Sequence, residues 1–165
     1  MKSIHIEETY HCSPETYWEK LWDADIRGER EKKGCGAVSY TVQEARWVGE
    51  TYHQVIEMVE VVDAPAAVRK IFGETSTIEE TSKWVKGSDT VRISYKPSIM
   101  GNKVSMAGVL TCRPADGGHS RIVLDLQITA TIFLVGSIIE GIICKALPKR
   151  QAKDVAYFNA HQAGS

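Results

Sequence analysis

Alternating apolar and polar residues mark seven segments that we predict to be β-strands. The clearest is 120–131, in which Ile122, Leu124, Leu126 and Ile128 alternate with more polar positions, the pattern of a strand with one buried face. The other six segments are 4–10, 38–48, 52–62, 76–86, 90–96 and 103–113. The links between the later strands are rich in turn formers and too short for crossover connections. The pattern therefore predicts an antiparallel sheet.

Three segments carry the signals of helices. Ser13 and Pro14 begin the first one, because serine suits the N-cap and proline suits the first helical turn. The stretch 65–72 ends at a glycine and predicts a short helix. The stretch 136–162 predicts a long C-terminal helix with one broad apolar face.

Pro148 should kink the C-terminal helix, because proline removes a backbone hydrogen bond and crowds the preceding turn. The apolar half before Pro148 is expected to grip the sheet more tightly than the basic half after it. The stretch 23–33 is dense in charges of both signs, which we interpret as a solvated helix end and loop. The apolar stretch 128–147 is interrupted by Glu140, which favours a strand end and a helix start over a membrane span.

The composition fits a single globular domain spanning residues 1–165. The formal net charge of −1 gives no electrostatic footprint for nucleic acid. The four cysteines have no C-x-x-C spacing and no H-E-x-x-H motif accompanies them, so we predict neither a metal nor another cofactor. Scattered thiols and first residues without a signal-like apolar run lead us to expect a cytoplasmic protein.

Four short motifs carry a family resemblance. The first strand followed by Ser13-Pro-Glu-Thr-Tyr-Trp18 resembles the opening of the START-like superfamily, which includes birch-pollen-allergen-type proteins, polyketide cyclases and lipid-transfer domains. The other three motifs resemble a START-like family of uncharacterised function that is found mostly in bacteria. These motifs are Asp63-Ala-Pro-Ala-Ala-Val-Arg-Lys-Ile-Phe-Gly73, Ile78-Glu-Glu-Thr-Ser-Lys-Trp84 and Leu134-Val-Gly-Ser-Ile-Ile-Glu140. The resemblance covers nearly the whole chain. Pro148 departs from the uninterrupted final helix that the family implies.

The fold class that the resemblance implies is α+β, with the helix-grip architecture. A curved seven-stranded antiparallel sheet would wrap around the long C-terminal helix, with one N-terminal helix and one short inserted helix. The resemblance further implies a cavity between the sheet and the C-terminal helix. That cavity would bind an apolar small molecule, lipid-like or polycyclic, for carriage or sensing without catalysis.

Apolar and amphipathic residues are the expected wall of this cavity: Tyr40, Met58, Trp84, Tyr95, Met106, Leu124, Leu126, Ile139, Ile142 and Phe158. Arg92 and Glu80 are candidate polar anchors, joined by the Tyr95 hydroxyl. The same residues would equally fill a packed core, and the sequence does not separate a packed interior from a hollow one. We also expect Trp84 to be buried between the sheet and the final helix.

Two further features suit ligand access or a transient contact with a membrane surface. We expect Ile99 and Met100 to lie at a hairpin tip, where polar residues are usual. Lys145, Lys149, Arg150 and Lys153 form a basic stripe beside an apolar helix face. The alternatives are that the tip tucks under the helix and that the stripe is a solvated face. The oligomeric state stays open.

Motifs for catalysis are weak. His11 and Cys12 are adjacent, so a strand would point them to opposite faces, and no G-x-S-x-G elbow is present. Two alternative functions remain beside ligand binding. One is a cyclase or hydrolase on the same scaffold, which needs a titratable group inside the cavity. The other is a membrane-surface docking module.

Overall fold

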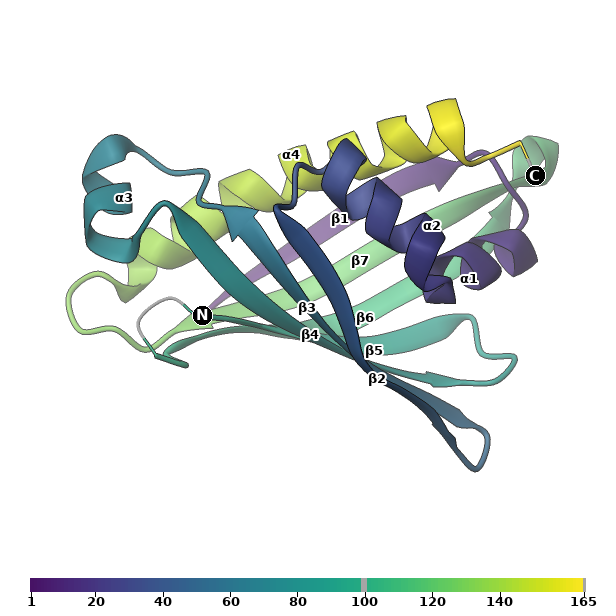
Figure 1. The fold of residues 1–165 in the computed structure, drawn as a ribbon, viewed down its shortest axis with the longest axis horizontal. Coiled ribbons are helices and arrows are strands. Elements are labelled where there is room, and N and C mark those ends of the chain that lie inside the picture. Colours follow the sequence, from purple (N-terminus) through teal and green to yellow (C-terminus); the bar gives the residue numbers. More distant parts are fainter. Residues whose placement is uncertain (99–100, 165) are drawn as a thin grey trace.

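Seven antiparallel strands form one curved sheet, and a long C-terminal helix lies along it (Figure 1). The computed structural model describes residues 1–98 and 101–164. The strands are β1 (Lys2–Tyr10), β2 (Ser39–Val48), β3 (Thr51–Val61), β4 (Thr75–Val85), β5 (Thr90–Pro97), β6 (Val104–Ala115) and β7 (His119–Ala130). The helices are α1 (Pro14–Trp22), α2 (Ala24–Glu29), α3 (Ala66–Phe72) and α4 (Gly136–His161), with a π-helical turn at Arg30–Gly34 and a 3-10 turn at Asp116–Gly118. The predicted helix-grip fold is confirmed.

The strand order β1-β7-β6-β5-β4-β3-β2 follows directly from sequential hairpins. Each strand from β2 to β6 pairs with the next strand along the chain, and β1 pairs with β7 to form one edge of the sheet. The register runs from Lys2 opposite Ile128 to Tyr10 opposite Ser120. The β2–β3 hairpin turns at Gly49, whose φ of 61° lies in the left-handed region that glycine adopts most readily.

Helix α1 begins as its sequence predicts. The Ser13 hydroxyl accepts a hydrogen bond from the Thr16 backbone N–H at 3.2 Å, and Pro14 occupies the first turn. The helix buries Tyr17, Trp18 and Leu21 against the concave face of the sheet. Its N-cap therefore fixes the orientation of an aromatic stripe that belongs to the core.

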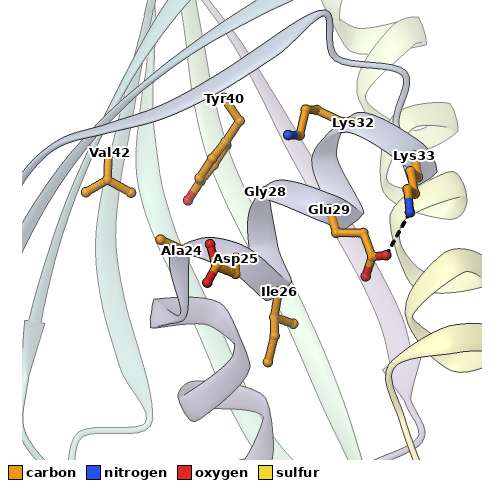
Figure 2. A pocket seen from close by; sticks show the side chains of 9 residues that line it. All are labelled: Ala24, Asp25, Ile26, Gly28, Glu29, Lys32, Lys33, Tyr40 and Val42. Atoms are coloured by element: carbon orange, nitrogen blue, oxygen red, sulfur yellow. Dashed lines mark hydrogen bonds and ion pairs between the residues drawn. The ribbon is translucent and has the colours of Figure 1, made fainter.

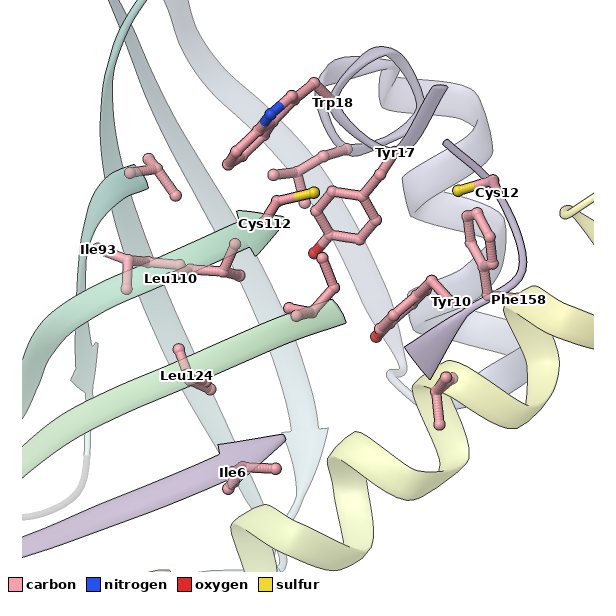
Figure 3. Packing of buried hydrophobic residues seen from close by; sticks show 14 of the residues in the cluster. Ile6, Tyr10, Cys12, Tyr17, Trp18, Ile93, Leu110, Cys112, Leu124 and Phe158 are labelled. Atoms are coloured by element: carbon pink, nitrogen blue, oxygen red, sulfur yellow. The ribbon is translucent and has the colours of Figure 1, made fainter. Parts of the chain in front are cut away.

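A buried hydrophobic cluster joins β1, α1 and the last turns of α4 to the sheet (Figure 3). The rings of Tyr10 and Phe158 meet edge to face with centroids 5.0 Å apart, and Tyr10 meets Tyr17 in the same way at 5.1 Å. Leu124 and Leu126 belong to the same buried cluster. This end of the interior is a packed core.

The start of α4 is clamped onto the end of β7. The Glu140 carboxylate accepts a hydrogen bond from the Ala130 backbone N–H at 3.0 Å and pairs with the Met1 amino group at 2.9 Å. A Cβ at Gly136 would overlap the carbonyl oxygen of Ala130, so only glycine fits the approach of helix to strand. The stretch 134–140, which resembles a family motif, thus has a structural role.

Helix α4 continues through Pro148, and each half contributes buried side chains. After Pro148, the side chains of Asp154, Val155 and Phe158 are buried. Before it, burial is confined to the first turns around Ile139, and the following residues are half-buried. The reason is that the apolar residues before Pro148 face a cavity, whereas those after it enter the aromatic core.

No helix among the described residues is both long and apolar enough to cross a membrane.

The charged stretch 23–33 is not the solvated loop that we predicted. It forms α2 and the π-helical turn, and it buries Arg27, Arg30 and Glu31. Arg27 meets Glu80 of β4, whereas Arg30 and Glu31 meet Asp154 and Arg150 of α4.

Candidate ligand-binding site

A cavity of about 470 Å³ lies between the first half of α4, the α3 segment and the ends of β3 to β6. This volume falls within the range of small-molecule sites. Its apolar wall is formed by Ile78, Pro97, Met106, Ile142, Ala146 and Leu147. The cavity therefore occupies the place between sheet and final helix where an apolar ligand was expected.

Charged and hydroxyl groups also line this cavity. The cationic ones are Arg69, Lys149, Arg150 and Lys153, and the acidic ones are Glu60 and Asp63. Ser76 adds a hydroxyl at the start of β4. The site thus combines an apolar wall with several convergent polar groups.

Arg150 stands between this cavity and a second, smaller space. Its guanidinium donates to Glu60, with Nε at 2.8 Å, and also to Glu31. Burial opposes protonation of Arg150, but the two carboxylates outweigh it and raise its pKa well above the ordinary value. Because Arg150 lines both spaces, its paired side chain forms the partition between them.

The second space is a small chamber of about 40 Å³, lined by buried charged groups and by apolar side chains. Arg27 donates to Glu80 at 2.7 Å, and Arg30 donates to Asp154 at 2.9 Å. The Nη1 groups of both arginines are buried without a protein partner among the described residues. A volume of this size holds only a few waters, which would satisfy those donors.

Electrostatics keep the chamber's charges fixed. Burial opposes ionisation of Glu31, but Arg150, Arg27 and Arg30 together outweigh it and lower its pKa to about 2. Burial, with a smaller contribution from the Glu80 carboxylate, raises the pKa of Tyr95 well above its ordinary value. Both groups therefore hold one protonation state across the physiological range.

Glu31, Cys35 and Asp154 bring their ligand atoms within 4.8 Å of one another, as a metal site would. Their donors are already engaged, because Glu31 is held by Arg150 and Asp154 by Arg30. Burial raises the pKa of the Cys35 thiol, which disfavours the thiolate that a metal needs. We therefore assign no metal to this group.

A groove of about 770 Å³ runs over the surface between α2 and the edge strand β2 (Figure 2). Exposed charged side chains line much of it, and Glu29 pairs there with Lys33 at 3.0 Å. Tyr40 faces this groove and not the 470 Å³ cavity. The mixed, solvated lining does not suit an apolar ligand.

The predicted wall residues fall into separate places. Met106 and Ile142 line the 470 Å³ cavity, and Tyr95 and Leu124 line the small chamber. Leu126 and Phe158 lie in the aromatic core, whereas Met58 and Ile139 are buried near the partition and the start of α4 respectively. Trp84 is half-buried and stacks on Trp18 of α1, with ring centroids 5.4 Å apart, so the expected burial under the final helix is wrong.

The predicted polar and access residues are similarly divided. Glu80 is 1 % exposed and belongs to the chamber, whereas Arg92 is exposed on the convex face of β5. Lys149, Arg150 and Lys153 line the cavity, and Lys145 is exposed outside it. The prediction for Ile99 and Met100 lies outside the described residues.

Sequence reasoning missed Arg69 and Ser76 at the cavity, and Arg27, Arg30 and Glu31 at the chamber. One signal was available for the second group. Positions 27, 30 and 31 have the i, i+3, i+4 spacing of a single helix face, which is the spacing of a buried stripe. Charge led us to assign that face to solvent.

Comparisons with solved structures agree on the fold. A protein from Thermus thermophilus named TTHA0849 superposes with a TM-score of 0.68 at 16% identity, covering 98% of this chain and 99% of the other. The Zhui aromatase/cyclase from Streptomyces sp. R1128 gives a TM-score of 0.66 at 14% identity, covering 99% and 98%. A START superfamily protein from Mycobacterium smegmatis gives 0.61 at 9% identity, covering 96% and 97%.

At these identities the likeness shows a shared fold, which is the helix-grip fold that the START-like resemblance implied. A search of curated protein sequences gave no match. Residues 5–160 match the family described as "Protein of unknown function (DUF2505)". The chain therefore belongs to this family of uncharacterised proteins, built on the START-like helix-grip fold.

Proposed function

We propose that this protein binds an apolar small molecule, lipid-like or polycyclic, in the 470 Å³ cavity and carries or senses it without chemical change. The observation that carries the proposal is the cavity itself, which places Ile78, Met106, Ile142 and Leu147 around one space under α4. Burying apolar ligand surface there would contribute about 25 cal/mol per Å². The fold shared with START-like proteins supports a ligand-binding role in general.

The charged groups of the chamber do not suit a catalytic role. A cyclase or hydrolase needs a group with a pKa near the working pH, within reach of its substrate. Here the carboxylates Glu31, Glu80 and Asp154 are each paired with a guanidinium. Arg150 separates these groups from the larger cavity, so a ligand in that cavity would not reach them unless the partition moved.

A neutral fluorescent probe tests the proposal. N-phenyl-1-naphthylamine brightens in apolar surroundings, and its titration gives a Kd for the wild-type protein. Ala146→Trp should fill the cavity, because Ala146 is part of its wall, and should raise the Kd by at least about tenfold. Ala152→Trp, on the exposed face of the same helix, is the matched control and should stay within about twofold.

Equal probe binding by Ala146→Trp and the wild type would show that the cavity is not the site. Thermal unfolding of both variants separates a blocked cavity from a damaged fold. Native mass spectrometry of the purified protein adds a second readout, since a carrier is expected to retain a co-purifying apolar molecule.

A transient membrane contact is a further proposal. Phe133 and Leu134, in the loop between β7 and α4, are 88% and 83% exposed, and large apolar groups at a loop tip suit insertion into a lipid interface. Flotation with anionic vesicles should capture the wild type and lose the double variant Phe133→Ser with Leu134→Ser. Recovery of both proteins in equal amounts would exclude the contact.

We also propose a reducing compartment such as the cytoplasm. All four cysteines are free, and Cys12 and Cys112 are buried. Unpaired buried thiols suit a compartment in which disulfides do not persist.

A further inference from the structure

Positive groups dominate the polar lining of the 470 Å³ cavity. Four cations face two acids there: Arg69, Lys149, Arg150 and Lys153 against Glu60 and Asp63. The chain as a whole carries a formal net charge of −1, so this excess belongs to the cavity and not to the protein in general.

Only one of the four cations has its charge fully engaged. Arg150 is bound by Glu31 and Glu60. Lys149 and Lys153 form no ion pair with any residue in 1–98 or 101–164. Arg69 forms one long ion pair, in which its Nε lies 3.7 Å from a carboxylate oxygen of the exposed Glu74. The two lysines are therefore available to a ligand, and Arg69 is held only by this long, partly exposed pair.

Two donors at one wall of the cavity are also unpartnered. Ser76 is 6 % exposed, and its Oγ is buried without a hydrogen-bond partner among the described residues. The Nε of Arg69 is also buried without a hydrogen-bond partner among the described residues. The two residues come from consecutive elements, α3 and β4, and both line the cavity. Buried donors in native proteins normally have an acceptor, so this wall lacks one that a ligand would supply.

Resting on the proposed function, we propose that the ligand is an anionic amphiphile. Its apolar body would lie on Ile78, Met106 and Ile142. Its carboxylate or phosphate head would accept hydrogen bonds from the Arg69 guanidinium and the Ser76 hydroxyl. A guanidinium suits both head groups, because its planar fork of donors matches an oxyanion and it remains charged at any working pH.

Competition against bound N-phenyl-1-naphthylamine tests the charge of the head. Dodecanoic acid, dodecyl phosphate and methyl dodecanoate share a twelve-carbon chain and differ in their heads. At pH 7.5, and below their aggregation concentrations, at least one of the two anions should displace the probe about tenfold more effectively than the ester. The stronger anion identifies the head group. Equal potency of all three, or no displacement of a bound probe, overturns the anionic proposal.

Different results would refute the proposed function and the anionic head group. A probe that does not bind at all removes the proposed function, whereas a probe displaced equally by the acid and the ester removes only the anionic head. Arg69→Gln should weaken the preferred anion about five- to tenfold and leave the ester unchanged. Lys70→Gln removes the same charge from an exposed position on α3 and should change neither. Equal loss of anion binding in both variants would show a general charge effect and overturn the assignment to Arg69.

Discussion

Replacement of Arg27 by methionine tests the buried charge network most sharply. Arg27 and Glu80 meet at 2.7 Å with side chains 6% and 1% exposed. Methionine keeps much of the side-chain length but leaves the Glu80 carboxylate buried, with the Ser82 hydroxyl as its one remaining hydrogen-bond partner at 3.2 Å among the described residues. Breaking a buried ion pair from one side typically costs about 3–5 kcal/mol, and we expect Arg27→Met to lie in that range.

Urea unfolding, monitored by tryptophan fluorescence, measures this cost. The double variant Arg27→Met with Glu80→Met removes both charges, and should be at least about 2 kcal/mol more stable than the sum of the single variants predicts. Arg92→Met, the same substitution on the convex face, is the control and should change stability by less than about 0.5 kcal/mol. A loss below about 1 kcal/mol for Arg27→Met, or strict additivity in the cycle, would refute the reasoning.

Three further predictions follow from named contacts. The pKa of Glu31, lowered from its ordinary 4.5 to about 2, should contribute stability that is present above pH 4.5 and lost as the pH falls toward 2. Glu31→Gln should flatten the plot of unfolding free energy against pH in this range, measured by urea titration, and an unchanged slope of that plot would contradict the assignment. The backbone amides of residues 137–147 of α4 should exchange hydrogen faster than those of residues 149–161, because the earlier half faces the cavity. The reverse order would mean that the aromatic core does not anchor the helix. Gly136→Ala should lower stability by about 1–3 kcal/mol, because its methyl group would overlap the Ala130 carbonyl; a neutral effect in thermal unfolding would show that helix and strand separate easily.

Local signals in the sequence were sufficient for most of the fold. Strand β7 alternates strictly because one face is buried along its length, and the Ser13 cap satisfies a backbone donor that would otherwise lack a partner. Both features depend on residues that are neighbours in the chain. The antiparallel pairing of the later strands follows from the short links between them, which are too short for crossover connections.

The site depended on pairs that are distant in the chain, and these left no local signal. Arg27 is buried because it pairs with Glu80, which lies 53 positions away in the sequence. Arg30 is buried because it pairs with Asp154, which lies 124 positions away. Without those partners, a run of mixed charge has the pattern of a solvated surface. The same limit applies to the interior, where Leu126 fills the core while Ile142 lines a cavity, although both are apolar residues on regular elements.

Methyl NMR of the protein labelled at Ile, Leu, Val and Met tests the central claim most directly. Titration with N-phenyl-1-naphthylamine should shift the methyl signals of Ile78, Met106, Ile142 and Leu147, which share the 470 Å³ cavity. The signals of Leu126 and Ile122, in the packed core, should move little. Shifts confined to exposed methyls such as Ile71 and Val85, or no shifts under conditions in which the probe is bound, would contradict binding under α4.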